Sequence, residues 1–165
     1  FKMNVNLSVG QLTEPNIVDM INDTITEIGI PFSNIGFEVT ESLAINDMNR
    51  MKEVLHSISS LGIDISLDDF GTGYSSLINI KEMPLSTIKI DKSFIDDLML
   101  NSNTEIFVKM IIELAHALNI RVCAEGVEEE YQYNRLLELN ADIIQGYYFG
   151  KPIPADEFEK KFEMQ

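Results

Sequence analysis

Two adjacent acids, Asp68 and Asp69, are the residues of this sequence that most directly suggest chemistry. They follow an apolar run in which Ile63, Ile65 and Leu67 alternate with polar residues, as in a half-buried strand. Two like charges side by side are costly unless a cation or a hydrogen-bond donor offsets their repulsion. Carboxylate oxygens suit Mg²⁺ and Mn²⁺, so the doublet is a candidate metal site. Acidic doublets also occur at ordinary surface turns, so the doublet alone does not decide the question.

Other polar residues stand at the ends of the remaining apolar runs. They are Asn6 and Ser8, Glu38 and Glu41, Lys89 and Asp91, Glu125 and Glu128, and Gln145. In a βα-barrel the carboxyl ends of all strands meet on one face, where active sites are built. Carboxylate and amide oxygens without histidine favour Mg²⁺, Mn²⁺ or Ca²⁺ over structural zinc. Two such ions held about 3.5–4 Å apart can hydrolyse phosphate esters.

Short apolar strands alternate with helical stretches along the chain. The predicted strands are Asn4–Ser8, Ile35–Thr40, Ile63–Asp68, Thr87–Asp91, Arg121–Glu125 and Asp142–Gln145. The predicted helices are Ile17–Ile28, Asn46–Leu61, Tyr74–Lys81, Thr104–Leu118 and Glu129–Leu139, with a last one after Pro154. This alternation predicts parallel strands joined by helical crossovers, in either a doubly wound open sheet or a βα-barrel. Polar groups at successive strand ends favour the barrel, because an open sheet concentrates its site at one switch point.

The length of 165 residues fits a single α/β domain that spans residues 1–165. A closed barrel needs eight strands and typically more than about 200 residues. The predicted strands are fewer than that, and the first of them begins within a few residues of Phe1. We therefore expect a TIM-like βα-barrel that is incomplete and lacks its first strands.

The chain is strongly acidic, with a net charge of −15 at pH 7 and a pI near 4.3. That balance argues against binding to duplex nucleic acid or to an anionic membrane surface, both of which need a basic face. It permits a small phosphorylated ligand, provided that divalent cations invert the local charge. We expect no membrane contact by this chain, since no apolar stretch approaches the ~18 residues of a transmembrane helix.

The single cysteine, Cys123, rules out an intrachain disulfide and fits a reducing, cytoplasmic setting. A longer parent protein anchored to a membrane through other domains would be compatible with that location. Cys123 lies inside an apolar strand-like run, where a free cysteine behaves as a small hydrophobic residue.

Lys89 lies among apolar neighbours in the predicted strand Thr87–Asp91. If its side chain points into the barrel mouth, it can orient an attacking water or stabilise charge on a phosphoryl group. If it points outward, it pairs with Asp91 or another acid. Gln145 presents a similar choice between orienting a ligand or water and satisfying backbone groups at a strand end. Histidine-based nucleophilic triads are excluded, because His56 and His116 both fall in predicted helices.

Six short motifs occur in order along the chain. They are Asn6-Leu7-Ser8, Phe37-Glu38-Val39-Thr40-Glu41, Asp68-Asp69-Phe70-Gly71-Thr72-Gly73, Ile88-Lys89-Ile90-Asp91, Ala124-Glu125-Gly126-Val127-Glu128 and Gln145-Gly146-Tyr147. Together they resemble the EAL family of bacterial cyclic di-GMP phosphodiesterases, over nearly the whole chain. The resemblance implies a TIM-like barrel that hydrolyses cyclic di-GMP to linear pGpG with Mg²⁺ or Mn²⁺ in a two-metal site.

The resemblance also implies a role for each motif residue. The residues implied to bind metal are Asn6, Glu38, Asp68, Asp69 and Glu125. Those implied to be catalytic are Lys89, which positions or activates the attacking water, Glu125 and Asp69. Those implied to contact substrate or to form the adjacent loop are Gln145, Glu41, Gly71, Thr72 and Gly73, with Glu41 as the anchor of the loop. Ser8, Asp91 and Glu128 are expected to support the site.

The Glu-Ala-Leu motif that names the family is absent from the sequence. In the family it belongs to an earlier strand, and its glutamate binds metal. The resemblance therefore implies a catalytic parent protein, with this chain as roughly the C-terminal two-thirds of its EAL domain and little activity for the chain alone. Open strand edges lead us to expect self-association, as a homodimer or by exchange of elements. Two alternatives stay open: a cyclic di-GMP receptor without turnover, and a protein-interaction module.

Overall fold

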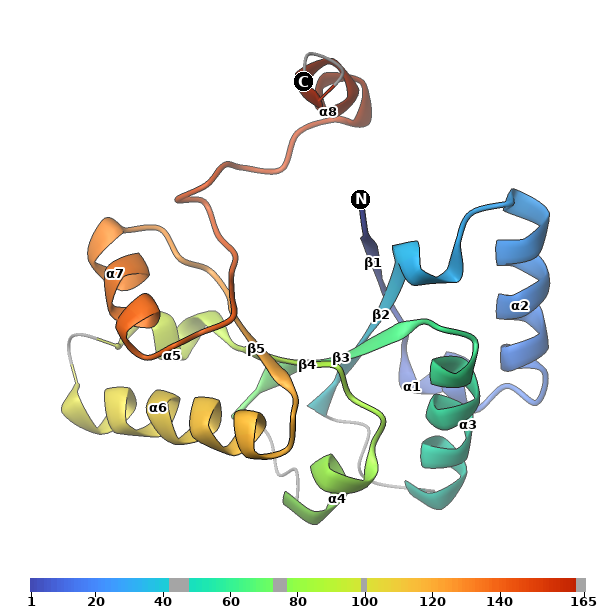
Figure 1. Ribbon diagram of the computed structural model, residues 1–165, viewed down its shortest axis with the longest axis horizontal. Helices are drawn as coiled ribbons and strands as arrows, with labels where there is room; N and C mark the ends of the chain where they lie inside the picture. Colours follow the sequence, from blue (N-terminus) through green and yellow to red (C-terminus); the bar gives the residue numbers. More distant parts are fainter. Residues whose placement is uncertain (42–47, 73–76, 99–100, 163–165) are drawn as a thin grey trace.

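Six parallel strands form one sheet in the computed structural model of the chain, which describes residues 1–41, 48–72, 77–98 and 101–162 (Figure 1). The strands are β1 (Met3–Asn6), β2 (Ile35–Thr40), β3 (Asp64–Phe70), β4 (Thr87–Ile90), β5 (Arg121–Ala124) and β6 (Ile143–Ile144). Each strand pairs with the next one along the chain. This unbroken order is that of a βα-barrel, because a doubly wound sheet reverses its order at a switch point. The predicted incomplete α/β barrel is confirmed, and no pairing joins β6 to β1 within the described ranges.

Most of the helices cover the outer face of the curved sheet. The helices are α1 (Val9–Leu12), α2 (Ile17–Ile28), α3 (Met48–Ser60), α4 (Leu77–Glu82), α5 (Lys92–Asp96), α6 (Ser102–Ala117), α7 (Glu130–Glu138) and α8 (Ala155–Phe162), with a 3₁₀ turn at Phe32–Asn34. Figure 1 shows α2, α3, α4, α6 and α7 in an arc around the sheet, while α8 lies apart on the open side, near the N-terminus. There the rings of Phe1 and Phe158 meet edge to face at 5.4 Å. None of the described helices is long and apolar enough to cross a bilayer.

Two short helices, α1 and α5, were not predicted from the sequence, because four or five residues are too few for an apolar period. Each follows a strand directly and is held by a polar cap. Ser8 accepts a hydrogen bond from the backbone N–H of Gln11 at the start of α1. Asp91 accepts one from the backbone N–H of Ser93 at the start of α5. Caps of this kind satisfy backbone donors that a helix cannot pair itself.

The longer helices match their predicted positions with small differences at the ends. Helix α6 begins at Ser102, ahead of the predicted start, because the Asn101 side chain caps it by accepting from Asn103 N. Gly29 and Asn119 follow α2 and α6 in the left-handed conformation, with φ of 76° and 58°. The predicted starts of the helices near residues 46 and 74 lie outside the described residues.

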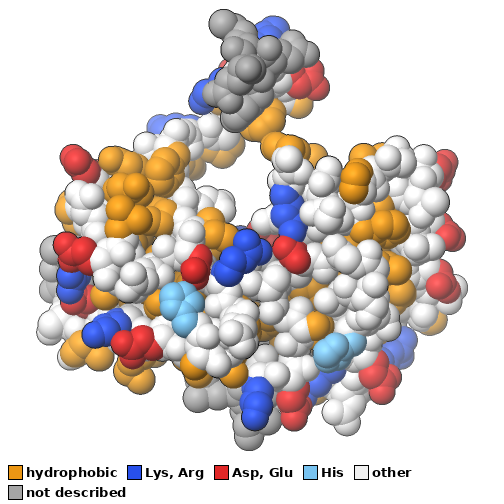
Figure 2. All heavy atoms as spheres, viewed as in Figure 1, with side chains coloured by type: hydrophobic (Ala, Val, Ile, Leu, Met, Phe, Trp, Pro, Cys, Tyr) orange, Lys and Arg blue, Asp and Glu red, His pale blue; other side chains and the backbone are white. Residues whose placement is uncertain are grey.

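The side chains of strand β4 alternate between the two faces of the sheet. Ile88 and Ile90 are fully buried in the core between the sheet and the helices. Thr87 and Lys89 alternate with them and line a small hollow of about 130 Å³ inside the half-barrel, together with Cys123 of β5. Burial, and then the charge of Glu125, raise the pKa of the Cys123 thiol to about 12, so it stays a neutral thiol. Figure 2 shows acidic and basic side chains meeting at the central opening of the molecule.

Candidate metal-binding site

An acidic cluster forms where β3 and β5 end. One carboxylate oxygen each from Asp68, Asp69 and Glu125 lie within 4.8 Å of one another. Between these strands lies β4, which carries Lys89. The parallel topology therefore brings the doublet beside an acid that follows it by more than fifty residues in the sequence.

Both acids of the doublet reach this cluster because strand β3 is irregular. The step from Leu67 to Phe70 on β3 is matched by the step from Ile88 to Ile90 on β4, so β3 carries one extra residue. Asp69 has a positive φ of 54°, a conformation that aspartate tolerates better than most residues. In a regular strand Asp68 and Asp69 would face opposite sides, whereas a bulge re-aims a side chain. The prediction that this strand ends at Asp68 was wrong, since β3 continues through the bulge to Phe70.

Lys89 points into the mouth of the half-barrel, which decides between its two predicted orientations. Its Nζ lies 2.7 Å from Glu125 Oε1, 2.9 Å from Glu38 Oε2 and 3.0 Å from Asp68 Oδ1. The residue is only 5% exposed. Asp91 is not its partner and caps α5 instead. A buried ammonium group thus holds together three carboxylates, from β2, β3 and the loop after β5.

The charges of the cluster perturb one another. Burial lowers the pKa of Lys89, but hydrogen bonds to Glu125 and Glu38 outweigh it, so the pKa lies well above its usual value and the lysine stays charged. Burial raises the pKa of Glu125, although Lys89 opposes the shift. Burial and the neighbouring charge of Asp68 raise the pKa of Asp69. The positive charge of Lys89 therefore does not fully compensate the negative charges of Glu125 and Asp69.

Glu38 is held from two sides. Its Oε2 pairs with Lys89, and its Oε1 accepts a hydrogen bond of 3.0 Å from the Asn4 side chain. Asn6 lies beside Glu38 in the β1–β2 register and lines a shallow hollow with it. Sequence reasoning missed Asn4, although its spacing of two residues from Asn6 places both on one face of β1.

The loop after β3 is anchored by Glu41. Glu41 Oε2 accepts a hydrogen bond of 3.0 Å from the backbone N–H of Gly71, two residues beyond Asp69. Gly71 has φ of 100°, and a Cβ there would lie 2.8 Å from the ring of Phe94. The Thr72 hydroxyl donates to the Asp69 carbonyl at 2.8 Å and tightens the turn. Gly73, also predicted to belong to this loop, lies outside the described residues.

The loop after β5 carries Glu125, Gly126 and Glu128. Glu128 lies outside the acidic cluster and pairs with Lys92 of α5 at 2.7 Å. Gln145 lines the 130 Å³ hollow together with Lys89, while its backbone carbonyl accepts from Val127 N at 3.0 Å. Its backbone carbonyl is therefore satisfied, and its side chain is exposed.

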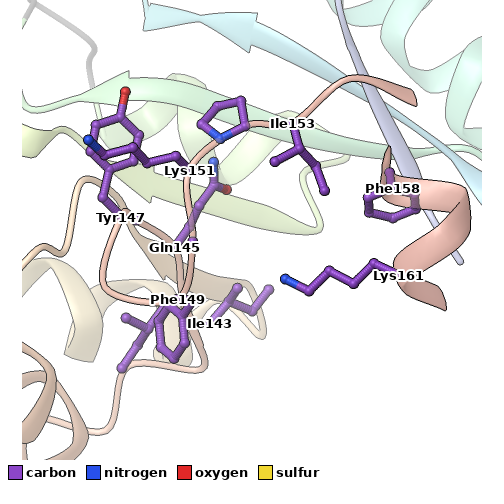
Figure 3. A pocket seen from close by; sticks show the side chains of 12 residues that line it. Ile143, Gln145, Tyr147, Phe149, Lys151, Ile153, Phe158 and Lys161 are labelled. Atoms are coloured by element: carbon purple, nitrogen blue, oxygen red, sulfur yellow. The ribbon is translucent and has the colours of Figure 1, made fainter. Parts of the chain in front are cut away.

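A second hollow, of about 660 Å³, lies between the segment after β6 and helix α8 (Figure 3). Gln145 reaches it, and its other walls are mainly apolar, with Lys151 and Lys161 as the charged residues. Figure 3 shows Lys161 extending from α8 across this space. None of the clustered carboxylates lines it, so the chemistry of the acids is not located there.

The residues present fit a divalent cation. Asp68 Oδ1 lies 3.0 Å from Lys89 Nζ, yet it is the one buried side-chain oxygen of the described residues without a hydrogen bond. Glu38, Asp68, Asp69 and Glu125, when ionised, carry four negative charges against the one of Lys89. All donors are oxygens, which suits Mg²⁺, Mn²⁺ or Ca²⁺.

Comparison with known proteins agrees with this geometry. The family model described as EAL domain matches residues 1–152. The chain is 42% identical over 156 residues to the signaling protein YkoW of Bacillus subtilis, covering 94% of this chain and 20% of YkoW. It is 39% identical over 153 residues to the bifunctional diguanylate cyclase/cyclic di-GMP phosphodiesterase MucR of Pseudomonas aeruginosa, covering 93% of this chain and 22% of MucR.

Two solved structures share the fold. The PaMucR phosphodiesterase in complex with c-di-GMP superposes with a TM-score of 0.90 at 38% identity, over 95% of this chain and 64% of that one. Klebsiella pneumoniae BlrP1, in a complex with manganese and cyclic di-GMP, gives a TM-score of 0.84 at 28% identity, over 92% and 39%. The chain spans about a fifth of the length of the curated relatives it matches.

Proposed function

This chain belongs to the EAL domain family, and on that basis we propose that it contributes the metal-binding centre of a phosphodiesterase that hydrolyses cyclic di-GMP to linear pGpG. The observation that carries the proposal is the grouping of Asp68, Asp69 and Glu125 around the buried Lys89. The c-di-GMP complex of PaMucR supports the choice of substrate. The manganese complex of BlrP1 supports a divalent ion, for which we propose Mg²⁺ or Mn²⁺.

Five oxygen-bearing side chains are proposed to hold metal. They are Asn6, Glu38, Asp68, Asp69 and Glu125. Bound divalent ions would supply Lewis acidity, making a bound water a stronger nucleophile and neutralising charge on phosphoryl oxygens. The acid-rich and partly buried setting explains why this cluster, in an already acidic protein, would attract cations strongly.

Lys89 is proposed to orient the attacking water and to stabilise negative charge that develops on the phosphoryl group. Its three ion pairs fix the ammonium group at the centre of the site, so little reorganisation is needed as that charge appears. Gln145 is proposed to contact substrate or water from the neighbouring strand end. Glu41 is proposed to hold the loop that carries Asp69, through its bond to Gly71.

The supporting residues act on the backbone. Ser8 and Asp91 cap the short helices that follow β1 and β4, and thereby fix where those strands end. Glu128 pairs with Lys92, which joins the loop after β5 to α5. Through these contacts we propose that the three residues hold Asn6, Lys89 and Glu125 in place.

Self-association is proposed as well, because both outer strands of the sheet lack a neighbour on one side in the described structure. Exposed strand edges pair readily with another chain. Light scattering over a range of concentrations tests this: a mass that rises with concentration supports it, and a constant monomer mass contradicts it.

The test of function is formation of pGpG from cyclic di-GMP by the purified chain with Mn²⁺, followed by chromatography. Protein is used in excess over substrate, since we expect slow turnover by this chain alone. We expect product with the wild type and none with Asp69→Asn or Lys89→Met, while Glu113→Gln, on the exposed face of α6, behaves as the wild type. Binding of cyclic di-GMP without product by the full-length parent protein would identify a receptor, and neither binding nor product by that parent would favour an interaction module.

A further inference from the structure

Gln132, in the first turn of α7, is a buried polar residue to which the proposed chemistry gives no role. It is only 3% exposed, among the most buried polar residues in the described structure. Glutamine is seldom so deeply buried, because its carboxamide must find hydrogen-bond partners to offset the loss of water. Its partners therefore indicate what the residue does.

The Gln132 carboxamide links two separate segments. Its Oε1 accepts hydrogen bonds from the backbone N–H groups of Glu128 and Glu129, at 2.9 and 3.0 Å. Its Nε2 donates to the backbone carbonyl of Ile95 in α5, at 3.3 Å. One side chain thus joins the loop after β5 to the helix that follows β4.

The loop that Gln132 holds is the one that carries Glu125. Beyond Glu125, Gly126 takes a positive φ of 71°, and the side chain of Lys92 lies directly over it. Val127 is fully buried and bonds through its N–H to the carbonyl of Gln145. The loop is therefore short and closely packed. It is joined on one side to Gln145, which follows β6, and on the other side to α5 through Gln132.

The helix at the other end of this link begins three residues after Lys89. Helix α5 starts at Lys92, two residues past the end of β4, and its Ile95 is fully buried. The N–H of Glu125 donates to the carbonyl of Ile90 at 3.2 Å, two residues before α5, so the loop and the start of α5 share an attachment to the end of β4. A displacement of α5 relative to the loop would therefore strain the 2.7 Å contact between Lys89 and Glu125.

We infer that Gln132 is a positioning residue for Glu125, because its carboxamide clasps the loop after β5 to α5 and so fixes Glu125 against Lys89. The inference rests on the proposed function only for the part that Glu125 plays in binding metal. Glutamine suits the position because it accepts from two N–H groups and donates to a carbonyl at once. Glutamate would keep the acceptor and lose the donor, and methionine would lose both.

A simpler role is that of an ordinary helix cap. Gln132 stands three residues after Glu129, the residue that precedes α7, where glutamine or glutamate commonly bonds back to the start of its helix. The two roles differ in the bond to Ile95. Glutamate can replace glutamine in a cap alone and is also favoured near a helix N-terminus. It cannot replace glutamine in the clasp, because it has no donor for the Ile95 carbonyl.

The experiment compares Gln132→Glu and Gln132→Met with the wild type in the full chain. Mn²⁺ affinity is measured by titration calorimetry, and the ¹³C signal of the Glu125 carboxylate, assigned with Glu125→Gln, is followed in metal-free protein. Asn101→Ala is the matched control, since it removes a cap from α6 that does not contact the site. We expect Gln132→Met to weaken Mn²⁺ binding about 10- to 100-fold, and Gln132→Glu to weaken it less, since partners behind metal ligands carry effects of that size.

The carboxylate signal decides the outcome whether or not metal binds. A shift of the Glu125 signal in Gln132→Glu, with no shift in Asn101→Ala, supports the clasp. Wild-type Mn²⁺ affinity and an unmoved Glu125 signal in Gln132→Glu would overturn it and leave a simple cap. Absence of Mn²⁺ binding by the wild type would contradict the proposed function, while the Glu125 signal would still test the clasp. If Gln132→Met does not fold, Gln132→Glu alone provides the test.

Discussion

The loops after β3 and after β5 deliver acids to the same cluster by different means. The first loop places Asp69 through unusual backbone geometry: an extra residue in the strand, φ of 54° at Asp69 and φ of 100° at Gly71. It is anchored by the hydrogen bond that the Gly71 N–H donates to Glu41. The second loop places Glu125 at the end of a regular strand and is held by buried polar contacts from Gln132.

The difference shows where each loop is sensitive to change. Gly71 lies against the rings of Phe94 and Phe107, which themselves pack together at 5.2 Å, so this loop depends on close steric fit. Gly126 is enclosed as tightly, since a Cβ there would lie 2.4 Å from Cγ and 2.7 Å from Cβ of Lys92, atoms close to the backbone of α5. Both loops are therefore expected to be sensitive at their glycines, and the loop after β5 depends in addition on the hydrogen bonds of Gln132.

Lys89→Met should have the largest effect, because Lys89 joins both loops through Asp68 and Glu125. Removal of one partner from a buried ion pair leaves the remaining charges uncompensated and typically costs about 3–5 kcal/mol. We expect a loss of that size in the free energy of unfolding, measured with urea. Added Mn²⁺ should restore part of it. A loss below about 1 kcal/mol, the range of exposed pairs, would show that Lys89 does not organise the cluster.

Exchange of glycine for alanine should destabilise both loops. Gly71→Ala combines an unfavourable φ with a clash against a packed ring, and we expect it to cost about 2–4 kcal/mol. Gly126→Ala combines a φ of 71° with a Cβ that would lie 2.4 Å from Lys92 Cγ, so a loss of about 2–4 kcal/mol is expected there as well. Thermal unfolding of both variants measures the losses. A loss below about 1 kcal/mol, less than the φ alone should cost, would contradict the proposed steric origin.

Glu41 should be next in size. Glu41→Ala removes the acceptor of the Gly71 N–H and should cost about 1–2 kcal/mol. Glu41→Gln retains an amide oxygen that can accept this bond, so its loss should be smaller. Hydrogen exchange at the Gly71 amide is the direct measurement. Unchanged protection of that amide in Glu41→Ala would show that the anchor lies elsewhere.

The smallest effect is expected in the pH dependence of the metal-free chain. Because burial raises the pKa of Glu125 above its ordinary value of 4.5, the folded state holds that proton more tightly than the unfolded state. Stability should therefore fall as pH rises from about 4.5 through the higher pKa of the folded state. Glu125→Gln should flatten this decline in melting temperature. An identical slope in both proteins would assign the decline to other groups.

The sequence was sufficient for the order and type of the strands and of the longer helices. Parallel strands alternating with helices, polar groups at each strand end and the incomplete barrel all follow from local periodicity and composition. The same pattern placed Asp68, Lys89 and Glu125 near one another, because neighbouring parallel strands bring their carboxyl ends to one edge. The short helices α1 and α5 escaped prediction, since their caps are clear only once the strands before them are known.

Three features were decided by the tertiary structure. The alternation of β3 sets Asp68 and Asp69 on opposite sides, and only the pairing with β4 introduces the bulge that brings them together. Lys89 had two possible orientations in the sequence, and the acids of β2, β3 and the loop after β5 select one. Gln132 shows helix-capping spacing in the sequence, but its partner Ile95 lies 37 residues away. Local periodicity determines which face of a strand or helix a residue occupies, whereas the partner of a buried charge or amide depends on chain segments that only folding brings into contact.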